Sequence, residues 1–173
     1  MKKTIIILAI IIMILSLNKE EKVIIPKKSI RFRVIADSNN KKDQDIKKEV
    51  VSGLKNKISR LDFSNNLNDN RKMIKEQIPE FKQVVEDTLA KNNYNKQYNI
   101  KYGMNYFPEK EYKGTIYKEG EYESLVITLG DGLGRNFWCV LFPPLCLLEA
   151  EDTKEVDKVE YKSFIKEVID KYF

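Results

Sequence analysis

The sequence predicts a single α+β domain, with a mainly antiparallel or mixed sheet packed by two or three amphipathic helices and preceded by an N-terminal hydrophobic leader. Residues 97–107 alternate between apolar and polar side chains, which is typical of a strand with one covered face. Within 41–59, apolar residues recur every four positions, which predicts an amphipathic helix. The 173 residues, 42% of them hydrophobic, are about one domain in length and sufficient to bury a core.

The N-terminus has the layout of an export signal. Lys2 and Lys3 precede an apolar run over 4–17, and a short positive region before such a run is typical of a secretory signal. The run is shorter than the roughly 17–25 residues of a membrane-spanning helix. Residues 1–18 are therefore predicted to be a cleaved signal sequence or an uncleaved membrane anchor. In both cases the rest of the chain lies outside the cytoplasm, with 19–29 as a tether and 30–173 as the single domain.

The first elements of the domain follow from periodicity and capping. Residues 30–36 predict a strand with Ile30, Phe32 and Val34 on one face and Arg31, Arg33 and Ile35 on the other. A turn over 37–40 follows, and Asn40 is placed to cap the helix at 41–59. A second helical stretch covers 69–91, with a break or restart expected at Pro79 because proline cannot donate a backbone N–H.

Later elements are predicted in the same way. Further strands are expected at 115–117, 121–129 and 136–142, with a turn at 118–120. The apolar run 136–142 predicts a strand buried on both faces. An acidic loop spans 149–157, and a C-terminal helix follows with one apolar stripe, formed by Tyr161, Ile165, Val168 and Tyr172.

Composition excludes several classes of function. The chain contains no histidine, which removes Ser-His-Asp and Cys-His catalysis and every zinc site that needs histidine. Its two cysteines cannot form a four-cysteine zinc site. The net charge of +5 is spread along the chain without a basic block, so nucleic-acid binding is not predicted. No metal or other cofactor is expected, and an enzyme would have to use carboxylate or lysine chemistry.

Glycines mark two turns. Gly130, Gly132 and Gly134 do not form a phosphate-binding loop, because no Gly-Lys-Ser/Thr follows and the spacing is not that of a dinucleotide fingerprint. They are predicted to connect two strands where a positive φ is needed, and Gly120 belongs to the predicted turn at 118–120.

The two cysteines leave two possibilities open. Cys139 and Cys146 flank Phe142, Pro143 and Pro144. In an exported protein such a pair predicts a disulfide. The alternative is a pair of buried free thiols packed as small apolar groups.

Two groups of segments carry a family resemblance. The first is Ile-Arg-Phe-Arg-Val-Ile-Ala-Asp-Ser over 30–38, followed by Asp43, Gln44 and Lys47. The second is Gly-Glu-Tyr-Glu-Ser-Leu over 120–125, Leu-Gly-Asp-Gly-Leu-Gly over 129–134, and Asn-Phe-Trp-Cys-Val-Leu-Phe-Pro-Pro-Leu-Cys over 136–146. Together they resemble the stage II sporulation protein R family.

The resemblance implies a function without catalysis. Members are made in the forespore of endospore-forming bacteria and exported to the space between forespore and mother cell. There they trigger a membrane-embedded aspartic protease, which cleaves the precursor of the sporulation factor sigma-E. By this resemblance the protein is a signal, and its partners are that protease and, through the leader, the membrane.

Three parts of the chain are predicted to form the partner-binding surface or its scaffold: the arginine strand, the corner after it and the segment before the second cysteine. Their residues are Arg31, Arg33, Asp37, Ser38, Asp43, Gln44, Lys47, Asn136, Trp138, Phe142, Pro143 and Pro144. For the two arginines the alternative is a solvated strand face, and for Trp138 it is a place in the core.

A weaker hypothesis is an extracytoplasmic glycan hydrolase that uses carboxylates. Glu121 and Glu123 fall on one face of a predicted strand, about 6–7 Å apart, a separation found in glycosidases. Asp131 is the third candidate. Alternating glutamates are also common on solvated strand faces.

Overall fold

The computed structural model describes residues 23–112, 114–146 and 158–173. The predicted leader, the first part of the predicted tether and the acidic loop at 149–157 lie outside these residues. Within the described part, no helix has the length and apolar character needed to span a membrane.

A four-stranded mixed sheet forms the centre of the domain, in the order β3-β6-β2-β7. Its strands are β2 (Ile30–Ile35), β3 (Tyr98–Phe107), β6 (Gly120–Leu129) and β7 (Asn136–Phe142). β2 is parallel to β6, and the other two pairs are antiparallel. The predicted α+β class with a mixed sheet is confirmed.

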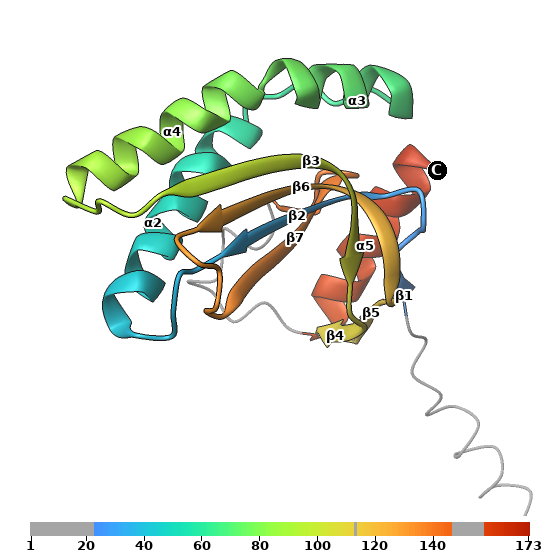
Figure 1. Cartoon of the computed structure of the whole chain (residues 1–173). Coiled ribbons are helices and arrows are strands. Elements are labelled where there is room, and N and C mark those ends of the chain that lie inside the picture. Colours follow the sequence, from blue (N-terminus) through green and yellow to red (C-terminus); the bar gives the residue numbers. More distant parts are fainter. Residues whose placement is uncertain (1–22, 113, 147–157) are drawn as a thin grey trace, which may run out of the picture.

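Three helices cover one face of this sheet (Figure 1): α2 (Lys41–Ile58), α3 (Leu67–Glu76) and α4 (Ile78–Lys91). The cap predicted at Asn40 is present, since its side-chain oxygen accepts a hydrogen bond of 2.8 Å from the backbone N–H of Asp43. The helical stretch restarts at Pro79, in the first turn of α4. There a backbone N–H has no partner within the helix, so proline costs nothing.

The main core lies between these helices and the sheet. Alternation along β2 places Ile30, Phe32 and Val34 in this core, each fully buried, and turns the two arginines to the opposite face. The face predicted for each side chain of this strand is therefore confirmed.

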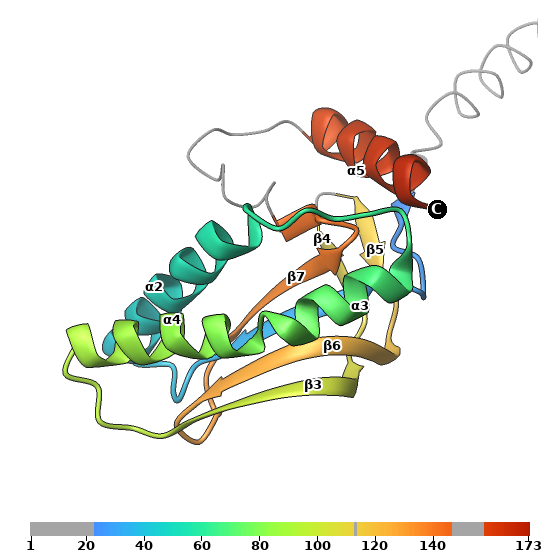
Figure 2. The ribbon, with the colours of Figure 1, turned by 90° about the horizontal axis from the view of Figure 1, so that it is seen from above.

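A second layer covers one end of the opposite face. It is a three-stranded sheet of order β1-β5-β4, made of β1 (Val23–Ile24), β4 (Lys110–Tyr112) and β5 (Thr115–Tyr117), with helix α5 (Lys158–Tyr172) beside it (Figure 2). A second apolar cluster holds it together: Ile25, Val140, Leu145, Tyr161 and Ile165.

The tether predicted at 19–29 is partly wrong. Val23 and Ile24 pair in parallel with β5, and Ile25 is only 2% exposed. The sequence suggested a tether because the segment is charged and contains a proline. Ile25 is buried in a cluster with Tyr161 and Ile165 of α5, which is distant in the sequence, so local pattern alone did not reveal the strand.

Two strand predictions need correction, because each strand is covered along only part of its length. Met104 and Tyr106, predicted on the covered face of β3, are 59% and 54% exposed, since the strand extends past the apolar cluster under the helices. β7 was predicted to be buried on both faces, but only its later half is fully buried. Its first residues, Asn136 to Trp138, are partly exposed at the sheet edge.

Candidate partner-binding site

The loop between β6 and β7 shapes one end of the candidate surface. These strands are not neighbours, because β2 lies between them, so the loop at 130–135 must cross the end of β2. The crossing is close: Leu133 N–H donates to the carbonyl of Asp37, and Gly134 N–H donates to that of Ala36, both at 2.9 Å.

The glycines make this crossing possible. Gly130 and Gly132 have φ values of 56° and 68°, so the predicted positive φ is confirmed at these two. Gly134 is needed for a different reason. A Cβ there would lie 2.3 Å from the carbonyl oxygen of Ser38, which is closer than two such atoms can approach.

Beneath the loop lies a buried polar network, which we call the polar corner: Asp37, Ser38, Asp43, Gln44 and Lys47. Asp37 accepts hydrogen bonds from the ammonium of Lys96 and, at 2.7 Å, from the backbone N–H of Asp131. The bond from Lys96, followed by that from Asp131, holds the pKa of Asp37 below its ordinary value.

The other members of the polar corner are equally well paired. Asp43 accepts from the hydroxyls of Ser38 at 2.6 Å and Tyr94 at 2.9 Å. Lys47 donates to the side-chain oxygen of Gln44 at 2.7 Å and to the carbonyl of Arg135 at 3.0 Å. Burial lowers the pKa of Lys47. Since these groups use their hydrogen bonds internally, the corner serves as the scaffold of the surface, and direct contact with a partner stays a prediction.

Arg31 lies on the opposite face of the sheet, in a very different environment. It is 2% exposed, and its guanidinium carbon is 3.4 Å from the ring centroid of Tyr122 and 5.3 Å from that of Phe107. One terminal nitrogen donates to the carbonyl of Lys118 at 3.1 Å, while Nε has no partner. The alternative of a solvated arginine is therefore wrong for this residue.

Arg33 extends the same face toward solvent. Its guanidinium carbon lies 4.4 Å from the ring centroid of Trp138, and its Nε is also buried without a partner. Within the described residues, no carboxylate comes within 4 Å of either guanidinium. Burial lowers the pKa of both arginines, yet a guanidinium stays protonated in proteins.

A pocket of about 210 Å³ opens beside Arg31 between the two sheets. We call it the Arg31 pocket. Arg31, Lys110 and Asn136 line it together with the aromatic rings of Phe107, Tyr117 and Trp138, and its lining contains no acidic residue. The predicted residues Arg31, Asn136 and Trp138 are thus brought together, and Trp138 lies at a pocket wall rather than in the core.

Phe107, Tyr117 and Tyr122 were not identified from the sequence. Alternation with the buried Leu125 would have placed Tyr122 on the face opposite the helices. The pairing of β6 with β2, which sets its ring against Arg31, has no local signal.

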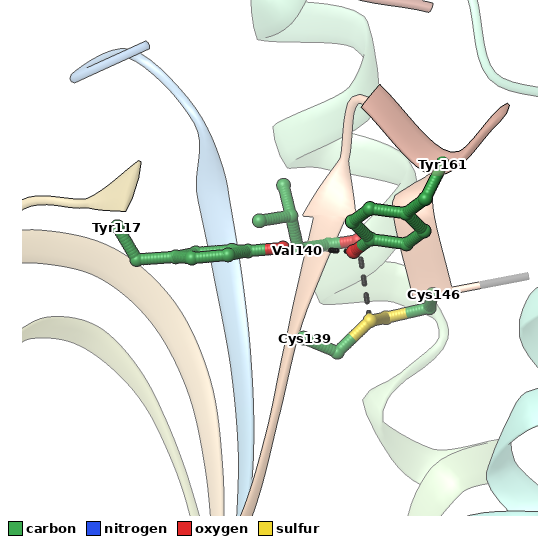
Figure 3. The surroundings of a disulfide bond; sticks show 5 residues. All are labelled: Tyr117, Cys139, Val140, Cys146 and Tyr161. Atoms are coloured by element: carbon green, nitrogen blue, oxygen red, sulfur yellow. Dashed lines mark hydrogen bonds between the residues drawn. A yellow bond between two sulfur atoms is a disulfide. The ribbon is translucent and has the colours of Figure 1, made fainter. Parts of the chain in front are cut away.

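The disulfide segment closes the other end of β7 (Figure 3). Cys139 and Cys146 form a disulfide with a Cα–Cα distance of 5.3 Å, the first of the two possibilities. Tyr117, Val140 and Tyr161 surround it, and the two tyrosine hydroxyls are 3.3 Å apart.

Phe142, Pro143 and Pro144 differ in how deeply they are buried. Phe142 is fully buried, with the rings of Phe63 and Tyr172 beside it. Pro143, which follows a cis peptide bond, is buried as well, and only Pro144 is partly exposed.

Of the three carboxylates in the hydrolase hypothesis, Glu121 and Glu123 lie on one face of β6, whereas Asp131 is separated from them. Glu123 is paired with Arg71 at 2.6 Å and accepts from the hydroxyl of Tyr102 at 2.8 Å. Asp131 follows the far end of β6 and lies roughly 25 Å from Glu123, as estimated from the rise per residue of a strand. The described residues contain no cluster of acidic or cysteine side chains that could hold a metal ion.

Comparisons with known proteins identify the class. The family model described as stage II sporulation protein R matches residues 26–152. The stage II sporulation protein R of Bacillus subtilis (strain 168) is 35% identical over 185 aligned residues, which cover 99% of this chain and 83% of that protein. No solved structure matches. The chain is a sporulation protein, and it belongs to the stage II sporulation protein R family.

Proposed function

We propose that this protein is exported from the forespore into the intermembrane space and there activates the membrane-embedded aspartic protease that processes pro-sigma-E. It acts as a signal and not as an enzyme. Membership of the stage II sporulation protein R family over most of the chain is the observation that carries this proposal.

Two structural features support an extracytoplasmic binding protein. The disulfide between Cys139 and Cys146 is a bond that persists in oxidising compartments outside the cytoplasm. The Arg31 pocket and Arg33 offer a preformed surface, held in place at one end by the polar corner. Binding of this surface activates the protease only if it prefers the active state of the protease over the inactive one.

Co-expression in a heterologous host tests the proposal. The full-length chain is produced together with the membrane protease and pro-sigma-E, and cleavage is followed by immunoblot. A matched culture carries the chain without residues 1–18, which keeps the domain but removes the predicted leader. Cleavage is expected with the full chain and not with the leaderless one.

The outcomes separate export from activity. Absence of cleavage, with all three proteins present and the full chain outside the membrane, would contradict activation. Equal cleavage with the leaderless chain retained in the cytoplasm would contradict action across the intermembrane space.

A further inference from the structure

Arg31 is a buried cation without a counter-ion among the described residues. Its side chain is 2% exposed, and its protein contacts are aromatic faces and one carbonyl. Cation–π contacts offset part of the cost of removing the charge from water. They do not replace a carboxylate, and an unpaired buried donor calls for a partner that the described residues do not supply.

The pocket beside Arg31 attracts anions. Lys110 lies at its rim, with the ammonium 5.8 Å from the ring centroid of Trp138, and the lining contains no acid to oppose it. Asn136 can donate to an anion through its NH₂ group. Its Oδ1, which is buried without a hydrogen-bond partner, is an acceptor and would instead favour a donor on the ligand.

We propose that the Arg31 pocket binds the side-chain carboxylate of an acidic peptide segment of a partner protein. This inference rests on the proposed function in one respect only: the proposed function decides which protein supplies the acidic segment. The planar guanidinium fork matches a carboxylate, and the aromatic walls offer apolar surface to the residues flanking the acid.

Size and wall chemistry favour a single side chain as the occupant. The volume of about 210 Å³ is below the roughly 300–1,000 Å³ of pockets that hold drug-sized ligands. Phosphate sites commonly use backbone N–H groups at a helix N-terminus, whereas every residue that lines this pocket lies on a strand.

Trp138 provides a direct readout, because it is the only tryptophan of the chain and lines the pocket. The full-length protein in detergent micelles is titrated with acetyl-Leu-Glu-Leu-amide while tryptophan fluorescence is recorded. The control peptide is acetyl-Leu-Gln-Leu-amide, which has the same shape without the charge. The glutamate peptide should bind about tenfold more tightly or better, as expected for a charge-assisted hydrogen bond. Equal affinity of the two peptides would overturn the proposal.

Substitution of the arginine localises the effect. Arg31→Met keeps an unbranched apolar stem and removes the charged guanidinium, so the preference for the glutamate peptide should disappear. Lys101→Met is the matched control, since it removes one positive charge from an exposed position of the same sheet, away from the pocket. Binding by Arg31→Met equal to that of the unchanged protein would refute the assignment. If that variant fails to fold, the two peptides on the unchanged protein still decide.

Inorganic phosphate tests the competing ligand chemistry. If phosphate changes the Trp138 fluorescence at lower concentration than the glutamate peptide, and only when Arg31 is present, the carboxylate assignment is wrong. The titration contains no protease. A failure of the proposed function would therefore appear in the co-expression experiment alone, and a failure of the pocket would appear here.

Discussion

Two clusters of buried charge lie at opposite ends of β2, and they differ in how their charges are satisfied. In the polar corner, Asp37 is paired with Lys96 and with a backbone N–H, and Lys47 has two oxygen acceptors. At the other end, Arg31 has one carbonyl and the faces of aromatic rings. A fully paired network fixes structure, whereas an unpaired buried cation lowers stability unless a ligand supplies the anion.

The difference separates scaffold from binding surface within one set of predicted site residues. Asp37, Asp43, Gln44 and Lys47 hold the loop at 130–135 across the end of β2. Arg31 and Asn136 instead have polar atoms without partners beside an open pocket. Two sets of substitutions and one change of pH test this contrast.

The largest expected effect comes from Gly134→Ala. The added Cβ would lie 2.3 Å from the backbone oxygen of Ser38, so the loop or the strand end must move. A loss of about 3 kcal/mol in the free energy of unfolding is expected, as for an overpacked site, measured by urea denaturation. Leu133→Ala is the control, because this side chain is 79% exposed and its removal should change stability by less than about 0.5 kcal/mol. If both substitutions changed stability by an equally small amount, the loop at 130–135 would not be tightly packed against the end of β2.

Removing one charge from each cluster is expected to change stability by a smaller amount, and in opposite directions for the two clusters. Lys47→Met leaves the side-chain oxygen of Gln44 and the carbonyl of Arg135 without this donor, which should cost about 2 kcal/mol. Arg31→Met removes an unpaired buried charge, so its thermal midpoint should be unchanged or higher. Lys48→Met, at the exposed neighbouring position, is the control for loss of a lysine. Strong destabilisation by Arg31→Met would mean that Arg31 is a structural residue.

The smallest expected effect depends on pH. The pKa of Asp37 is lowered in the folded state, so its ionised form stabilises the fold above the unfolded pKa of about 3.9. This contribution is lost as the pH falls through the folded pKa. The difference in urea midpoint between the unchanged protein and Asp37→Asn should therefore be present at pH 7 and shrink below about pH 4. Asp45→Asn, in an exposed pair with Lys41, should show little difference at either pH.

Much of the fold could be predicted because its signals are local. The alternation over 30–36 identified both faces of β2, and Asn40 and Pro79 marked where helices begin. The glycine loop was recognised as a strand connection, with a positive φ at Gly130 and Gly132. The exposed side chains of β3 could not be predicted, because they depend on where the helices stop covering the sheet. The strand at Val23–Ile24 could not be predicted either, because it depends on pairing with β5, which is distant in the sequence.

The candidate site divides in the same way. The sequence alone was sufficient for the family and for the face on which Arg31 and Arg33 lie, because these depend on local motifs and on alternation along one strand. It left open whether Cys139 and Cys146 form a disulfide, which the structure settles with a Cα–Cα distance of 5.3 Å. Only the tertiary structure decided that Tyr122 and Phe107 enclose the guanidinium of Arg31, and that the polar corner is internally paired. These contacts join segments that are distant in sequence, and the order β3-β6-β2-β7, which brings them together, is set by the burial of the whole sheet and not by any single segment.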